Sequence, residues 1–457
     1  GMTRPTKEHQ PKGKNIMQAK AVILSYNTDA EHLCACAARI STTPGTATEI
    51  YRKTPDAEKD RKLVANVIRS GHRSVIEHAV FHIAFEDVSV AVEEFVIEFR
   101  LASYTVKSRR YVDYGTMGYY VPNGLTEEGE ALYRTHVDSL FADYNFLNAH
   151  GIPKEDSRFV LPYCFYSNFY CTVNARELIH MVQEMKYGRG REDAELCALA
   201  DQLIAQLADV FPVAASRIVP YAEGTEPDCT VTAHLPLSDT PCEVRPAATL
   251  LSLTPNGEKL ICEAASLLCP DGAISSPAEC MRRYPRTAEQ VSAAFRIDGL
   301  SLSSVTHLVR HRMQSSVIPP LSTVDPNRYI VPDTVAADAE CLARYRAAFA
   351  RNAKTFMRLR DMGLARESCL CLSGNTLSVM TTQNARELML FFRLRTCNRA
   401  QWEIREVAQS MLGLLQHEMP AVFCGMGPSC VLTDRCPEGR LSCGRMEEMR
   451  RIYRERG

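Results

Sequence analysis

The chain has 457 residues, of which 46% are hydrophobic, and its 53 basic and 54 acidic side chains leave a formal net charge of −1 and an isoelectric point near 6.9. This balance argues against a nucleic-acid-binding surface, and no apolar run is long enough to cross a bilayer. Eighteen cysteines without a signal-peptide core indicate reduced thiols, so we expect a cytoplasmic protein of two domains that contacts neither membrane nor nucleic acid.

Helical and extended patterns alternate along the chain. Residues 62–70 carry apolar side chains at helical spacing and stop before Gly71, which suits a helix C-terminus. Residues 82–86 alternate as a strand does, and residues 384–394 again show helical spacing. No Gly-x-Gly-x-x-Gly follows a strand, so a Rossmann site is not expected. This mixed order predicts an α+β fold rather than a doubly wound sheet.

The repeat described below and the composition together divide the chain into four predicted parts. Residues 21–225 are predicted as the first copy of a domain, and residues 248–425 as a second copy. Between them, residues 226–247 are rich in Pro, Thr, Asp and Glu and are predicted as a linker. Residues 426–457 form a tail with cysteines and charges, whose Arg/Glu-rich stretch 445–456 predicts a short exposed helix.

An internal repeat is the basis for two copies. The motif Asn-Ala-Arg-Glu-Leu occurs at residues 174–178 and again at 384–388, and Leu-Ser at 24–25 recurs at 251–252. A period of roughly 210 residues is far longer than a solenoid repeat, so the repeated unit is a whole domain.

Each copy keeps motifs that the other lacks. The first copy has Gly-His-Arg-Ser at 71–74, Ser-Arg-Arg-Tyr at 108–111 and Arg-Phe-Val-Leu-Pro at 158–162; the second has Arg-His-Arg at 310–312, Leu-Arg at 394–395 and Gln-Trp-Glu at 401–403. Reciprocal losses of this kind predict a site assembled from both copies.

The motifs resemble those of the flavin-dependent thymidylate synthases, which carry the same patterns in the same order, and the resemblance extends over residues 22–423. Each motif is weak alone, whereas order and spacing together are specific. The resemblance implies two tandem copies of that family's fold, with mixed helices and an antiparallel sheet. It also implies reductive methylation of dUMP to dTMP, with FAD as cofactor and with NADPH and methylenetetrahydrofolate as co-substrates.

The resemblance assigns substrate roles to individual residues. Arg395 matches the family arginine that polarises the uracil ring, so it is the candidate catalytic residue. The candidate substrate-binding residues are Ser108, Arg110, Arg158, His307 and Arg310. Guanidinium groups suit a nucleotide phosphate because they form planar, charge-assisted hydrogen bonds. Without the resemblance, such residues would be read as loop caps, ion pairs or a solvated helix face.

The resemblance also implies a flavin-binding set. Its members are Ser41, His72, Ser74, Asn174, Arg176, Arg310, His311, Arg312, Asn384 and Arg386. Some of these residues have a purely structural alternative. Asparagine caps helices well, and His72 could be a turn residue held by local hydrogen bonds.

Each copy has lost one half of such a site. Glu98 stands in the first copy where the second has Arg310, and a carboxylate there would repel an anion. Met185 likewise matches Arg395, while residues 316–321 carry adjacent prolines in place of Ser-x-Arg-Tyr. We therefore expect a homodimer of two-copy chains that imitates the tetramer of the family, with live and dead sites in equal number.

Two questions stay open at this point. Thr105 and Val106 stand where the family has an acidic or amide residue, so the alternatives are a flavoenzyme acting on another pyrimidine nucleotide, or a catalytically silent flavin- or nucleotide-binding protein. Four tail cysteines could ligate zinc, but they lack paired Cys-x-x-Cys spacing, so no metal is expected; they are Cys424, Cys430, Cys436 and Cys443.

Overall fold

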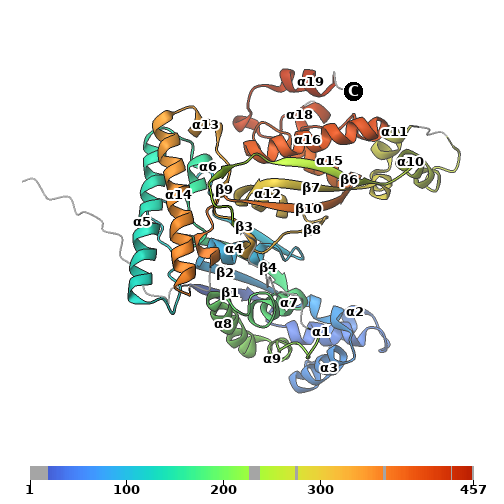
Figure 1. Ribbon diagram of the computed structural model, residues 1–457. Helices are drawn as coiled ribbons and strands as arrows, with labels where there is room; N and C mark the ends of the chain where they lie inside the picture. Colours follow the sequence, from blue (N-terminus) through green and yellow to red (C-terminus); the bar gives the residue numbers. More distant parts are fainter. Residues whose placement is uncertain (1–18, 226–236, 273–275, 364–366, 434, 455–457) are drawn as a thin grey trace, which may run out of the picture. The chain divides into compact units, whose positions relative to one another are not determined.

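The computed structural model describes residues 19–225, 237–272, 276–363, 367–433 and 435–454 (Figure 1). The chain forms two compact units. Unit 1 comprises Gly1–Ala233 and Arg344–Cys371, and unit 2 comprises His234–Ala343 and Leu372–Gly457. Among the helices of the described ranges, none combines the length and the apolar character that crossing a membrane requires.

The elements follow one another in a similar order in the two halves of the chain. The first half contains β1 (Lys20–Tyr26), α1 (Ala30–Arg39), α2 (Ala47–Tyr51), α3 (Ala57–Arg69), η2 (Arg73–His78), β2 (Val80–Ser89), α4 (Val90–Ile97), β3 (Ala102–Val106), α5 (Glu127–Ala149), α6 (Lys154–Ser157), η3 (Arg158–Val160), β4 (Tyr166–Asn174), α7 (Ala175–Lys186), α8 (Ala194–Val210) and α9 (Pro212–Ala215). The second half contains β5 (Cys242–Glu243), β6 (Ala247–Leu253), α10 (Gly257–Ser266), α11 (Pro277–Arg283), η4 (Pro285–Gln290), β7 (Ser292–Ser301), α12 (Leu302–Val309), β8 (Ser315–Val317), η5 (Leu321–Thr323), β9 (Arg328–Tyr329), α13 (Asp333–Ala336), α14 (Ala339–Asp361), η6 (Glu367–Leu370), β10 (Thr376–Asn384), α15 (Ala385–Arg395), α16 (Trp402–Glu418), α17 (Pro420–Phe423), α18 (Ser429–Leu432), η7 (Gly439–Leu441) and α19 (Met446–Arg454).

Each half builds one four-stranded sheet. Strand order is β1-β2-β4-β3 in the first and β6-β7-β10-β8 in the second, and every neighbouring pair in both sheets is antiparallel. The central strand β2 alternates along part of its length because Phe81, Ile83 and Phe85 face the core. The α+β class and the antiparallel sheet are therefore confirmed. The strand predicted at 82–86 lies within β2. The helices predicted at 62–70 and 384–394 match α3 and α15, except that Ser70 is the C-cap of α3 and Asn384 is the last residue of β10 and the N-cap of α15.

The junction between sheet and helix is the same in both halves. Ser89 ends β2 and its Oγ caps α4, and Ser301 ends β7 and its Oγ caps α12 in the same way. Two residues earlier, each strand has a left-handed backbone, with a φ of 48° at Asp87 and 68° at Gly299. A Cβ added at Gly299 would lie 2.9 Å from the Arg245 carbonyl oxygen, so glycine is required there.

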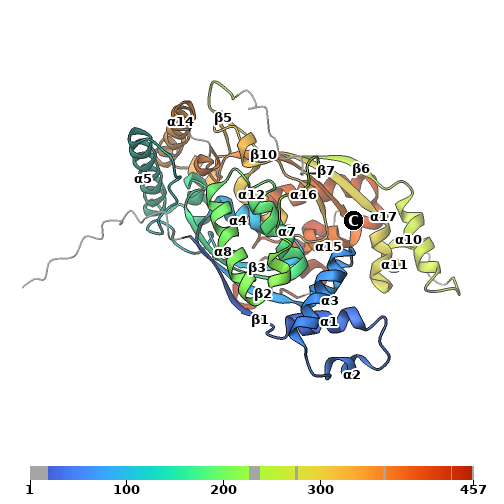
Figure 2. The same ribbon diagram turned by 90° about the horizontal axis from the view of Figure 1, so that it is seen from below.

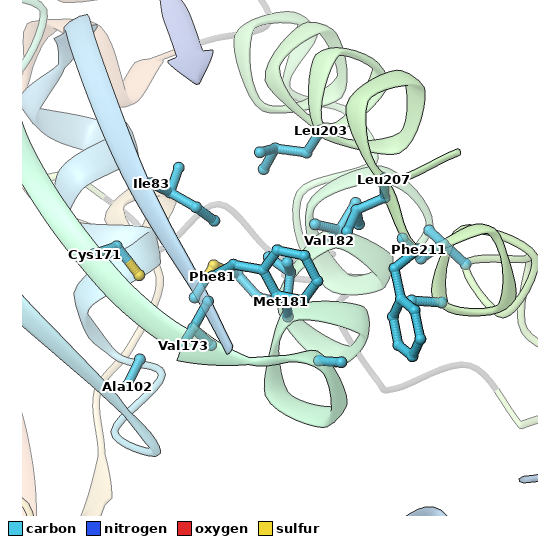
Figure 3. Close-up of a cluster of buried hydrophobic side chains, with 14 of the residues drawn as sticks. Phe81, Ile83, Ala102, Cys171, Val173, Met181, Val182, Leu203, Leu207 and Phe211 are labelled. Carbon is cyan, nitrogen blue, oxygen red and sulfur yellow. The ribbon is translucent and has the colours of Figure 1, made fainter. Parts of the chain in front are cut away.

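The core of the first half lies between its sheet and helices α7 and α8 (Figure 3). It brings together buried side chains of both layers: Phe81 and Ile83 from β2, Cys171 and Val173 from β4, Met181 and Val182 from α7, and Leu203 and Leu207 from α8. Each large side chain removed from water contributes roughly 1.5–3 kcal/mol, so this core is a main source of the stability of unit 1.

The long helices α5 and α14 lie side by side in unit 1 (Figures 1 and 2), although they come from different halves of the chain. Asp143 of α5 forms ion pairs with Arg344, at 2.5 Å, and with Arg351 of α14. Nε2 of His136 and Oδ1 of Asn352 are 2.8 Å apart. Part of the second half of the sequence thus completes unit 1.

Two sequence predictions concern the linker and the tail of the chain. Residues 226–236 of the predicted linker lie outside the described ranges. The last part of the predicted linker, residues 242–247, contains β5 and the first residue of β6. The copy boundaries stay a prediction.

The exposed helix predicted at the end of the tail is α19, and here the prediction was partly wrong. Met449 and Tyr453 are buried, and Tyr453 packs against Gly427 and accepts a hydrogen bond from Gln409.

Candidate functional site

Unit 2 brings together three of the second-copy candidates. Nε of Arg395 donates a 3.0 Å hydrogen bond to Nε2 of His311, and its Nη2 donates to the His307 carbonyl oxygen at 3.1 Å. His307 lies in the buried helix α12 and His311 just after it, while Arg395 ends α15, so the C-terminal ends of two helices bring these side chains together. The guanidinium is therefore held in one orientation by two contacts.

Arg310 and Arg312 flank the buried His311 and are both exposed. Arg310 is the C-cap of α12, so the helix ends where these side chains begin to reach solvent. Guanidinium groups that are exposed on either side of a buried imidazole suit an anionic ligand such as a phosphate.

Unit 1 brings together the first-copy candidates for substrate binding, two of which contact Glu155. Nε of Arg110 lies 2.8 Å from the Glu155 carboxylate, and Nε of Arg158 donates to the Glu155 carbonyl oxygen at 3.1 Å. The Ser108 Oγ accepts the backbone N–H of Arg110 at 3.2 Å, which fixes the loop. Burial lowers the pKa of Arg158 to about 10, and Arg109 contributes to this shift. Sequence reasoning missed Glu155, which belongs to none of the recognised motifs.

Arg109, between two candidates, has a structural role that sequence reasoning also missed. It is 6% exposed and pairs with Glu93 at 2.9 Å and with Glu94 at 3.4 Å. Glu93 in turn accepts a hydrogen bond from the Ser167 hydroxyl. This buried cluster anchors the loop that carries Ser108 and Arg110.

The structure places three of the first-copy flavin candidates on the surface of unit 1. Ser41, His72 and Ser74 are exposed. The Ser41 hydroxyl donates to the Ala38 carbonyl oxygen at 3.4 Å, and His72 precedes η2 without capping it through its side chain. None of the hydrogen bonds found in the described part of unit 1 joins Ser41 to His72 or Ser74.

The repeated Asn-Ala-Arg motif has the same contacts in both halves. Asn174 caps α7 and Asn384 caps α15, each accepting the backbone N–H three residues later. Arg176 pairs with Glu77 at 2.6 Å, and Arg386 pairs with Glu289 at 2.5 Å. The capping alternative for both asparagines is confirmed, and a flavin role for either motif stays a prediction.

In the first copy, the place of the Arg-His-Arg triplet is filled differently. The Glu98 carboxylate pairs with Arg189 at 3.0 Å, and burial raises the pKa of Glu98. Phe99 packs edge-on against His180, with ring centroids 5.2 Å apart. A carboxylate and a phenyl ring thus stand where the second copy has Arg310 and His311, and the loss of anion binding at this place stays a prediction.

Thiols of the tail gather around Cys430. Burial raises the pKa of Cys430, and the neighbouring thiols Cys397, Cys436 and Cys443 raise it further. Cys397 was not part of the predicted tail group. Within the described ranges, no three or more His, Cys, Asp or Glu side chains are arranged to hold a metal ion.

Comparison with known proteins gives one consistent family. The family described as "Thymidylate synthase complementing protein" matches residues 22–213 and 249–421. The flavin-dependent thymidylate synthase of Geobacter sulfurreducens is 34% identical over 232 residues, which cover 45% of this chain and 97% of that protein. The enzyme of the same name from Clostridium tetani is 31% identical over 238 residues, with coverage of 45% and 95%. A match in two segments, with relatives that span less than half of the chain, confirms the tandem arrangement.

Among solved structures, the chain is similar to the UMP/dUMP methylase PolB from Streptomyces cacaoi, which was crystallised with 5-Br dUMP. That similarity has a TM-score of 0.38 and 24% sequence identity, and it covers 44% of this chain and 94% of that one.

Proposed function

This chain belongs to the family of flavin-dependent thymidylate synthases, and from that membership we propose that it methylates dUMP to dTMP, with methylenetetrahydrofolate and NADPH as co-substrates, at sites shared between its two copies. The observation that carries the proposal is the fixed guanidinium of Arg395, held by His311 and the His307 carbonyl oxygen. A preorganised donor of this kind stabilises negative charge on a pyrimidine ring without reorganising during the reaction.

The first copy would hold the nucleotide. Arg110 and Arg158 offer two guanidinium groups to the phosphate, and the Ser108 hydroxyl lies on the same loop as Arg110. Binding would exchange the Arg110–Glu155 ion pair for contacts with the phosphate. Burial of Arg158 would strengthen its contact, because charge-assisted bonds gain strength away from water.

The residues present also fit a flavin. The exposed Arg310 and Arg312 suit its phosphates, and Asn384 and Arg386 at the start of α15 would contact its adenosine end, as would their first-copy equivalents. When bound and reduced by NADPH, the flavin supplies the hydride. The protein's part is to bind, orient and polarise the substrate.

The sharing of sites rests on complementary losses. Arg395, Arg310 and His311 exist only in the second copy, and Ser108, Arg110 and Arg158 only in the first. We infer that a dimer of two-copy chains pairs one set with the other and imitates the tetramer of single-copy relatives.

The test is to measure flavin content per chain, followed by NADPH oxidation with and without dUMP. We expect about one FAD per chain and oxidation accelerated by dUMP, since each dimer would have two live sites. Two FAD per chain would contradict the complementary-loss argument. Arg395→Lys keeps the charge but not the planar fork, so kcat should fall about 10²–10³-fold.

A second candidate substrate follows from β3. Thr105 and Val106 pair with Tyr170 and Phe169 of β4, and Val106 offers no polar atom from its side chain where the family has an acidic or amide residue. A different pyrimidine nucleotide would fit such a site. Turnover of UMP or dCMP in preference to dUMP in the same assay would favour this candidate.

A further inference from the structure

We propose that Glu387 is a positioning residue for Arg395 and acts through His311: it holds the His311 imidazole in the neutral tautomer that carries its proton on Nδ1, so that Nε2 accepts the hydrogen bond of Arg395. The Glu387 Oε1 lies 3.6 Å from Nδ1 of His311, and Nε2 of the same ring lies 3.0 Å from Nε of Arg395. The inference rests on the proposed function insofar as Arg395 acts on the substrate.

The tautomer follows from the chemistry of the donors. An arginine Nε–H can only donate, so Nε2 of His311 must present its lone pair to Arg395. In a neutral imidazole the proton is then on Nδ1, the atom that faces the Glu387 carboxylate. A nearby carboxylate favours an N–H pointing toward it, and here the surroundings screen the attraction little, because the side chains of His311 and Glu387 are only 4% and 10% exposed.

Helix α15 places the carboxylate and the guanidinium on the same face. Glu387, Phe391 and Arg395 are spaced by four residues, so they lie on one face of the helix. The Phe391 ring packs edge-on against His311, with centroids 4.9 Å apart. The imidazole is thus held between the carboxylate at one end of this face and the guanidinium at the other.

The first copy contains the same carboxylate without the arginine. Glu177 occupies the equivalent place in the repeated motif on α7, where its carboxylate lies 3.7 Å from Nδ1 of His180. Met185 stands where the second copy has Arg395. Because Met185 replaces the candidate catalytic arginine there, Glu177 provides a matched control within the same chain.

The experiment compares Glu387→Gln with Glu177→Gln in the full-length protein. The amide keeps the size of the side chain and removes the charge. We expect Glu387→Gln to lower kcat about 10–100-fold, the usual effect of losing a group that orients a functional side chain. Its KM for dUMP and its flavin content should stay within about two-fold of wild type, and Glu177→Gln should match wild type. Glu387→Asp, which keeps the charge, should recover part of kcat.

A second readout does not depend on activity. With ¹⁵N-labelled histidine, the wild-type protein should show His311 as a neutral ring protonated on Nδ1, and Glu387→Gln should show a mixture of tautomers. A wild-type ring protonated on Nε2 would overturn the proposal even if Glu387→Gln did not fold. Equal losses of kcat in Glu387→Gln and Glu177→Gln would also overturn it. If no pyrimidine nucleotide is turned over while the Nδ1 tautomer is found, the proposed function fails and the orienting role of Glu387 stands.

Discussion

Arg109 shows how burial decides the role of a single residue. It lies between Ser108 and Arg110, in a motif where the family pattern specifies no residue at that position. Arg110 is half-buried and pairs with a carboxylate near the surface, whereas Arg109 points into unit 1 and meets Glu93, which is 0% exposed. Neighbouring arginines in one motif thus lie in opposite environments: Arg110 pairs near the surface, and Arg109 pairs inside the core.

Replacing Arg109 should therefore cost stability. In Arg109→Met, the buried Glu93 would lose its counter-charge, and we expect a loss of about 3–5 kcal/mol in the free energy of unfolding, measured in urea. Arg61→Met removes an exposed arginine that pairs with Glu31 at 3.2 Å, and should change the same quantity by less than about 1 kcal/mol. A similar small effect from Arg109→Met would show that the buried cluster does not stabilise the fold.

At the scale of elements, the two asparagine caps connect fold and site. Asn384 begins α15, the helix whose far end holds Arg395, so the start of the helix sets the position of the candidate catalytic group. The sequence allowed either a capping role or a flavin-binding role for Asn384. The cap is seen, and the two roles can be separated because serine also caps helices but has no amide.

Two substitutions at Asn384 make that separation. Asn384→Ala should cost about 1 kcal/mol of stability, measured as a lower melting temperature, and Asn384→Ser should recover most of it. If the amide also contacts the flavin, Asn384→Ser should still bind FAD more weakly than wild type in a fluorescence titration. Full recovery of both stability and FAD affinity in Asn384→Ser would leave the cap as the whole role of this residue.

At the scale of the whole molecule, α14 joins the second half of the sequence to unit 1. His136 of α5 lies against Asn352 of α14 in a buried position, and burial lowers its pKa to about 4. The folded state therefore favours the neutral imidazole. The ordinary pKa of histidine is near 6.5, so His136 of the unfolded chain becomes protonated as the pH falls below that value. In the folded chain His136 stays neutral until the pH approaches about 4.

Stability should accordingly depend on pH through His136. Between pH 7 and pH 5, the wild-type protein should lose roughly 2 kcal/mol more of its unfolding free energy than His136→Gln. Above pH 7 the difference between the two proteins should not change with pH. Chemical denaturation of both proteins across this range makes the comparison, and parallel curves between pH 7 and pH 5 would contradict the assigned cause.

Local chemistry explains what could be read from the chain alone. Apolar periodicity predicted β2, α3 and α15, because burial of one face imposes a spacing on the sequence itself. Motif order and the repeat predicted the family and the tandem arrangement, and asparagine before a helix predicted the caps. Such features depend on residues close together in the chain, or on a pattern of motifs, and both are visible in one dimension.

Tertiary structure alone decided which charged groups meet. Glu155 pairs with Arg110, Glu387 faces His311, and the residues from 344 to 371 belong with the first half of the chain. These contacts connect residues tens to hundreds of positions apart, and no local spacing encodes them. Only the packing of the sheets and helices brings such groups within the few ångströms over which hydrogen bonds and buried charges act.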